Sequence, residues 1–204
     1  MNEFDLKART WDADPAKWER ARAVAEAIKT RVPLAPTMNA LECGCGTGLL
    51  SFALRSRLGK ITLADSSDGM LAVLKEKIAA TGVTNLTPVK FNLETDPLPA
   101  EKHQLVYTLL TAHHIADTDK LLRDFHALLT APGWLCLADL DTEDGSFHGA
   151  GFSGHNGFDR AELAAQARGA GFQEVSFATV FRINKEVGGQ RREFPVFLMV
   201  AKKG

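Results

Sequence analysis

Five short apolar runs recur along the chain, each bounded by polar or glycine-rich residues. They cover residues 39–43, 60–65, 84–91, 104–110 and 133–140. Most of the intervening stretches carry apolar side chains three and four positions apart, which is the spacing of an amphipathic helix. This alternation is typical of a parallel sheet whose strands are joined by helices.

The expected helices begin at capping residues and end at glycine or proline. Asp14 and Pro15 open the first helix, which should end near Val32. Asp159 and Glu162 are spaced for a capping box at the start of the last helix. The expected helices span residues 14–32, 49–57, 68–78, 117–129 and 158–169.

Two further apolar runs, 174–181 and 193–201, are joined by a charged loop without a helix. Consecutive strands connected in this way pair antiparallel. The pattern therefore predicts an α/β fold with a seven-stranded, mostly parallel sheet, helices on both faces and an antiparallel C-terminal strand pair. The 204 residues suit a single domain. Within it, residues 1–32 form an N-terminal helical segment, either packed on the sheet edge or acting as a lid that carries Trp11 and Trp18.

The net charge and the cysteine content limit which binding partners and which cellular compartment are expected. The formal net charge is −1, so no global basic field points to nucleic acid. The longest apolar runs are too short to span a bilayer, and the first residues lack the basic and apolar segments of a secretory signal. Three cysteines do not form a disulfide framework. We therefore expect a cytoplasmic protein; its oligomeric state is not encoded in any of these patterns.

The segment 41–48 joins the first apolar run to the first helix after it. It contains Glu42, followed by glycines at positions 44, 46 and 48. Glycine permits positive φ and removes the Cβ that would keep a ligand away from the backbone. The following helix directs free N–H groups toward the same turn. A dinucleotide fingerprint would need a sixth-position glycine, where Leu49 stands.

This segment resembles the first motif of the class I S-adenosylmethionine (SAM)-dependent methyltransferases. The order Asp65, Ser67, Met70, Leu71 resembles their second motif. By order of elements the resemblance extends over about residues 14–201, and it is greatest to small bacterial-type members with a histidine-rich loop and Gly157-Phe158-Asp159. It implies a Rossmann-like fold, methyltransferase activity, and SAM as cofactor with S-adenosylhomocysteine as product.

The expected cofactor site lies at the carboxyl ends of the strands, where open α/β sheets bind ligands. Asp65 can accept both hydrogen bonds of a ribose diol; its alternative role as a helix cap has closer candidates. Asn92 stands where the resembled family often has an aspartate that binds the adenine amine. Met70 is also a core candidate. The expected cofactor-binding residues are Glu42, Gly44, Cys45, Gly46, Gly48, Asp65, Ser66, Met70, Asn92, Leu93 and Thr108.

The acceptor site is expected between the segment after the fourth strand and the long loop 142–157. His113 and His155 are the catalytic candidates, since imidazole titrates near neutral pH and methyl transfer needs a base only if the acceptor loses a proton. His114, Asp141 and His148 are the substrate-binding candidates. For the adjacent histidines a structural role is the alternative, and at least one of the two should point away from the site.

Several alternatives remain open at this stage. Asp139, Asp141, His148 and His155 have donor atoms suited to a divalent metal, but they lack tight ligand spacing, so no metal site is expected. The acceptor is expected to be a small molecule whose identity the sequence does not encode. RNA or protein acceptors, or a non-catalytic SAM-binding module, are the competing interpretations.

Overall fold

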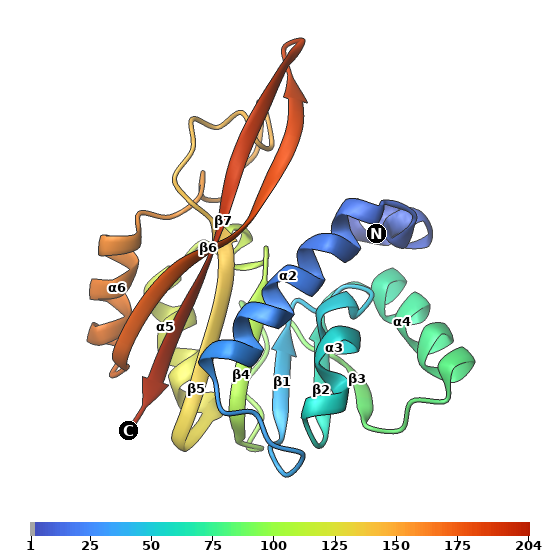
Figure 1. Cartoon of the computed structure of the whole chain (residues 1–204), viewed down its shortest axis with the longest axis vertical. Helices are drawn as coiled ribbons and strands as arrows, with labels where there is room; N and C mark the ends of the chain where they lie inside the picture. Colours follow the sequence, from blue (N-terminus) through green and yellow to red (C-terminus); the bar gives the residue numbers. More distant parts are fainter. Residues whose placement is uncertain (1–2) are drawn as a thin grey trace.

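Seven strands form one mixed sheet in the computed structural model, which describes residues 3–204 (Figure 1). The strand order is β3-β2-β1-β4-β5-β7-β6; β1 to β5 are mutually parallel, and β7 runs antiparallel to β5 and β6. The predicted fold class is therefore confirmed. The strands are β1 Ala40–Cys43, β2 Ile61–Asp65, β3 Leu86–Lys90, β4 His103–Leu109, β5 Leu129–Leu140, β6 Gln173–Val187 and β7 Gln190–Lys203.

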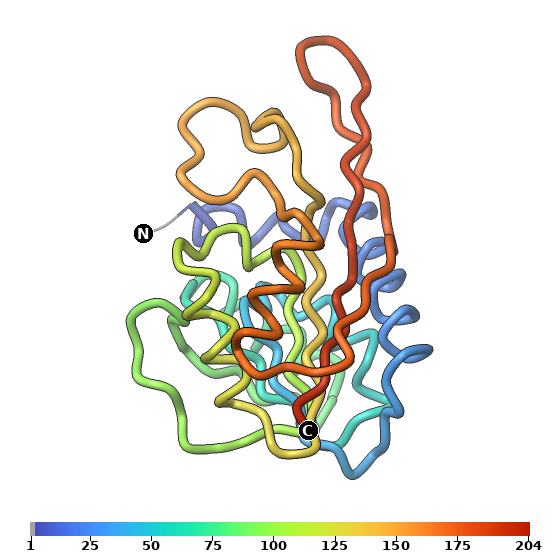
Figure 2. Tube along the Cα trace, turned by 90° about the vertical axis from the view of Figure 1, so that its left-hand side faces the viewer, coloured from blue at the N-terminus to red at the C-terminus, as the bar shows by residue number. Residues whose placement is uncertain are grey.

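Helices cover both faces of this sheet. Helices α2 and α3 lie on one face and α5 and α6 on the other, as both views show (Figure 1 and Figure 2). The α-helices are α1 Glu3–Lys7, α2 Pro15–Arg31, α3 Leu49–Leu54, α4 Asp68–Thr81, α5 Thr118–Leu128 and α6 Arg160–Gly169, and the 3₁₀ helices are η1 Ala8–Ala13, η2 Arg55–Arg57 and η3 Ala112–His114. No helix within residues 3–204 combines the length and apolarity needed to cross a membrane.

The caps expected from the sequence explain where several helices begin. Asp14 accepts a hydrogen bond from the Ala16 N–H at 2.9 Å, and Asp159 accepts from two N–H groups at the start of α6. Ser67 caps α4 by accepting from the Met70 N–H at 3.1 Å. Each cap satisfies N–H groups that have no partner inside the helix.

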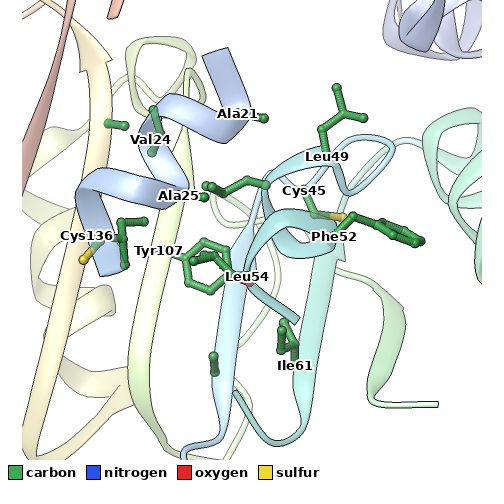
Figure 3. Close-up of a cluster of buried hydrophobic side chains, with 14 of the residues drawn as sticks. Ala21, Val24, Ala25, Cys45, Leu49, Phe52, Leu54, Ile61, Tyr107 and Cys136 are labelled. Carbon is green, nitrogen blue, oxygen red and sulfur yellow. The ribbon is translucent and has the colours of Figure 1, made fainter. Parts of the chain in front are cut away.

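The central strand β4 contributes to two separate cores because its side chains alternate between faces. Leu105 and Tyr107 pack into the cluster beneath α2 and α3, shown in Figure 3, whereas Val106 packs beneath α5. All three side chains are fully buried. Burying one such apolar side chain contributes about 1.5–3 kcal/mol, so the sheet holds the strand ends in fixed positions.

Two regions extend beyond the sequence prediction. Within the N-terminal segment expected to be helical, α1 and η1 precede α2 and extend the helices beyond the start expected at Asp14. The β6–β7 hairpin runs past the predicted strand ends and projects above the sheet (Figure 1). In this arm, the backbone of residues 181–194 pairs only with the other strand of the hairpin. Polar side chains alternate along the arm, and Arg182 and Glu193 form an ion pair across it.

Candidate active site

A cavity of about 530 Å³ lies at the carboxyl ends of the central strands. That volume is within the usual range for small-molecule sites, and the position is the one expected for an open α/β sheet. Twelve residues named from the sequence line it: Glu42, Gly44, Cys45, Gly46, Asp65, Ser66, Met70, Asn92, Leu93, His113, His114 and His148. The strand ends therefore bring both groups of candidate residues to one cavity.

The glycine loop is shaped by close contacts with its surroundings. Gly44 has φ of 66°, and a Cβ there would lie 2.3 Å from the Thr111 side chain. Gly48 has φ of 82° and leads into α3, and a Cβ there would lie 2.7 Å from Leu74. Gly48 does not line the cavity, so its contribution is the close approach of the loop to α4. Gly48 was expected to contact the cofactor, but its position favours a role in loop packing.

Asp65 ties the glycine loop to the end of β2. One carboxylate oxygen accepts from the Gly46 N–H at 2.7 Å, and the other accepts from the Ser67 N–H at 2.8 Å. Burial raises the pKa of Asp65, and these backbone hydrogen bonds oppose the rise. Because each carboxylate oxygen can accept more than one hydrogen bond, Asp65 can still receive two ligand hydroxyls. Ser67 caps the helix, which leaves Asp65 free of that role.

A buried acid and a guanidinium stand in the wall near the glycine loop. Glu42 is only 2% exposed, accepts a hydrogen bond from Ser51 Oγ, and has its pKa raised by burial to about 8. Arg20 of α2 lines the same cavity, and its buried Nε has no partner within residues 3–204. Burial lowers the pKa of Arg20, partly offset by the charge of Asp14. An acid and a guanidinium in one wall suit the ammonium and carboxylate of an amino acid.

Sequence reasoning missed Arg20. It belongs to no motif, and the only available signal was its place beside Ala21, which was expected on the buried face of α2. Arg20 reaches the cavity that the glycine loop lines only because α2 packs across this part of the sheet. That crossing depends on tertiary packing, which a single sequence does not display.

Three imidazoles gather in another part of the cavity wall. His113 and His114 come from η3, and His148 comes from the loop after β5. His113 Nε2 lies 3.0 Å from His148 Nε2, and the His113 and His114 ring centroids are 4.2 Å apart. The expectation that one of the adjacent pair points away is therefore wrong. The tight 3₁₀ turn of η3, with φ and ψ unlike those of a strand, directs both rings to one side.

Asp139, at the end of β5, fixes the orientation of His113. Its Oδ1 lies 2.6 Å from His113 Nδ1, and its Oδ2 accepts from the His113 N–H at 3.2 Å. Both side chains are buried. A carboxylate accepts from Nδ1–H, so the Nε2 lone pair of His113 faces the cavity. Burial, followed by the charge of His113, lowers the pKa of His114 and of His148 to about 4, so both are neutral near pH 7.

Three other residues named from the sequence lie off the cavity, each engaged elsewhere. His155 Nε2 donates to the Ile115 carbonyl at 2.9 Å, Asp141 accepts two hydrogen bonds from Arg160 at 2.6 and 2.7 Å, and Thr108 Oγ1 donates to the Cys43 carbonyl at 2.8 Å. None of the three lines the cavity. They hold the walls of the cavity instead.

Aromatic side chains from distant segments close the remaining sides. Phe4 and Trp11 approach from the N-terminal helices, and Phe147 approaches from the loop after β5. Asp12 anchors the N-terminal segment to the glycine loop, accepting from Thr47 Oγ1 at 2.5 Å. Trp18 does not line the cavity; it packs against the core. Residues 1 and 2 of the expected N-terminal segment lie outside the described residues.

Comparison with known proteins agrees with this arrangement. A family model described as a methyltransferase domain matches residues 40–133. The ubiquinone/menaquinone biosynthesis C-methyltransferase UbiE of Psychromonas ingrahamii is 32% identical over 107 residues, which cover 50% of this chain and 42% of that protein. The chain thus matches less than half the length of this curated relative.

Solved structures share the fold at low sequence identity. A SAM-dependent methyltransferase from Aquifex aeolicus has a TM-score of 0.63 at 21% identity, covering 91% of this chain and 98% of its own. Haemonchus contortus phosphoethanolamine N-methyltransferase 2, in complex with phosphomonomethylethanolamine and S-adenosylhomocysteine, has a TM-score of 0.73 at 17% identity. Its match covers 88% of this chain and 52% of the other. At these identities the likeness shows the fold alone.

Proposed function

We propose that this chain is a class I SAM-dependent methyltransferase and that it transfers a methyl group from SAM to a small-molecule acceptor. The observation that carries the proposal is one cavity whose lining includes both the glycine loop and three histidines. The residues near the glycine loop have donors and acceptors suited to the cofactor. The histidines are suited to an acceptor beside the methyl.

The residues near the glycine loop fit each part of SAM. Glu42, which is buried, would hold the ammonium, and Arg20, whose buried Nε has no partner within residues 3–204, would hold the carboxylate. Asp65 would accept the ribose hydroxyls, and Asn92 with Leu93 would border the adenine. When bound, SAM supplies a sulfonium methyl that is electrophilic without further activation. The chain's contribution is to hold the two reactants in line and close together.

Among the three histidines, we assign the acceptor contact to His113. Its Nε2 lone pair faces the cavity and can receive a hydrogen bond, and then the proton, from an acceptor hydroxyl or amine. His114 and His148 would border the acceptor. His155 and Asp141, once expected at the site, would instead position the loop that carries His148.

Side chains that cover the cavity favour a small acceptor. Phe4, Trp11 and Phe147 close over it, so the N-terminal segment and the loop 142–157 would act as covers that exclude water. The UbiE relatives are named for small-molecule C-methylation in quinone biosynthesis, which supports a small acceptor. Nucleic acid is disfavoured by the net charge of −1, and three free, buried cysteines support a cytoplasmic location.

The test uses SAM labelled in its methyl group with fractionated metabolite extracts, followed by His113→Ala on the acceptor found. We expect kcat to fall about 10²–10⁴-fold while the Kd for SAM changes less than about twofold. His126→Ala, a histidine on α5 that packs against Phe172, is the matched control and should keep full turnover. A chain that binds SAM tightly but labels no acceptor would instead be a non-catalytic SAM-binding module.

A further inference from the structure

The three histidines lie close enough together to share one ion. A ring nitrogen from each of His113, His114 and His148 falls within 4.8 Å of the other two. Metal–nitrogen bonds of about 2.0–2.1 Å place two imidazole nitrogens about 3.0–3.4 Å apart. The 3.0 Å separation of His113 Nε2 and His148 Nε2 already fits that spacing. Within residues 3–204, this is the single group of potential ligands that meets such a distance limit.

We propose that these three imidazoles bind one divalent transition-metal ion, with the remaining coordination positions open to the cavity. Neutral imidazole ligands favour Zn²⁺, Co²⁺, Fe²⁺ or Ni²⁺ over Mg²⁺ and Ca²⁺, which prefer oxygen. Three protein ligands with open positions are typical of catalytic rather than structural metal sites. The site was not expected from the sequence, because His113 and His148 are separated by 35 residues and Asp139 contacts only one of them.

Asp139 supports the proposal independently of the spacing. Metal-binding histidines usually donate their second ring N–H to a carboxylate or carbonyl, which fixes the ring and makes it a better ligand. Here Asp139 Oδ1 lies 2.6 Å from His113 Nδ1, and both groups are buried. The arrangement leaves Nε2 of His113 unprotonated and aimed at the same point as Nε2 of His148.

A simple hydrogen-bonded chain explains less of the geometry. His148 Nε2–H could donate to His113 Nε2, which would account for two of the three rings. It gives no partner to His114, whose ring contacts within residues 3–204 are with Phe4, Phe152 and the two other imidazoles. A shared ion would use all three rings, His114 included.

The metal would deepen the proposed function by selecting the acceptor, and this step alone rests on that function. All three histidines line the cavity, so the open positions would take an acceptor hydroxyl. With the ion bound, the Nε2 lone pair of His113 is taken by the metal, so coordination replaces its role as proton acceptor. The pKa of the coordinated hydroxyl falls, its proton leaves to water, and the oxygen lone pair forms the O–CH3 bond. The electron pair of the broken C–S bond returns to sulfur. The substrate class is then an alcohol, phenol or enol.

The experiment uses the full chain without a polyhistidine tag, stripped with chelator and titrated with Zn²⁺ in a calorimeter. We expect one ion per chain, and visible absorption on Co²⁺ substitution that reports nitrogen ligation. His148→Ala, in a loop, should weaken Zn²⁺ binding at least 100-fold, and Asp139→Asn should weaken it 10–100-fold. His126→Ala is the matched control and should bind one ion as tightly as wild type.

Thermal unfolding of each metal-free variant separates lost ligands from lost folding. The proposal is overturned if folded wild type binds Zn²⁺ no more tightly than folded His148→Ala. If His148→Ala shows no cooperative unfolding and so is not folded, His114→Ala takes its place, and full Zn²⁺ affinity in folded His114→Ala overturns the proposal. Metal binding is measured without acceptor or SAM. Stoichiometric binding in a chain that methylates nothing would therefore sustain the metal site while refuting the proposed function.

Discussion

Removing the Asp65 side chain should weaken SAM binding far more than it weakens the fold. Asp65 is the point where the end of β2, the glycine loop and the start of α4 meet, through its bonds to Gly46 and Ser67. Its two oxygens retain acceptor capacity directed at the cavity. Asp65→Ala removes these acceptors and the charge together, and leaves two backbone N–H groups without their partner.

The size of the effect follows from the bonds that would be lost. A hydrogen bond to a charged group contributes about 1.5–3 kcal/mol, so loss of one weakens binding at least about tenfold. Loss of both ribose contacts would give a hundredfold change or more. Because burial already raises the pKa of Asp65 and so disfavours its charged form, we expect the lower part of that range.

Calorimetry with SAM and S-adenosylhomocysteine would measure the change. Asp68→Ala is the matched control, because Asp68 lies three residues away, is exposed, and pairs with Lys90 at 2.6 Å. Such a surface pair contributes little, so SAM affinity should stay within twofold. A deoxyribose analogue of S-adenosylhomocysteine should lose affinity for wild type but not for Asp65→Ala. Equal losses in both chains would mean that Asp65 shapes the loop without contacting the ribose.

Three further outcomes are expected. Between pH 5 and 9, cofactor-free wild type should lose about 4 kcal/mol of unfolding free energy relative to Glu42→Gln. Burial raises the pKa of Glu42 from 4.5 to about 8, so its contribution falls progressively between these values and is gone above pH 8; a constant difference in denaturant titrations would contradict this. Arg20→Gln should weaken SAM binding about tenfold or more, yet leave binding of methylthioadenosine, which lacks the carboxylate, unchanged in calorimetry. His155→Ala should remove the hydrogen bond to Ile115 and lower the Tm by roughly 2–4 °C, with turnover per folded molecule preserved; loss of turnover without loss of stability would restore His155 as a catalytic group.

The elements predicted best are those whose signals are local. Asp14 and Asp159 cap the helices they were expected to cap, because capping depends on a few neighbouring residues. The apolar run of β4 predicts a strand covered on both faces, and Val106 and Tyr107 are fully buried on opposite sides. The cofactor residues follow from the same logic, since parallel strands end at one edge of the sheet.

The remaining features depend on contacts between distant residues. The β6–β7 arm outruns its apolar pattern because its paired strands satisfy each other's backbone groups, while Ile183 and Phe194 on one face still contact the core. His155 and Asp141 carry the right chemistry, but contacts with Ile115 and Arg160 hold them outside the cavity. The pairing of His113 with Asp139 joins two strand ends 26 residues apart, which no local spacing encodes.

The loop that carries His148 has no helix or strand of its own, yet it is fastened at several points. Its base is closed by the Thr142 N–H bond to the Phe158 carbonyl at 3.1 Å, its middle by the ion pair between Asp144 and Arg192 of the arm, and its far side by the His155 N–H bond to the His113 carbonyl at 2.8 Å. Each fastening divides one long span into shorter ones, and a short span has far fewer conformations to lose than a long free one. The projecting arm therefore lowers the entropy cost of ordering the loop. As a result, this irregular segment can hold His148 in a fixed position, as the end of a strand would.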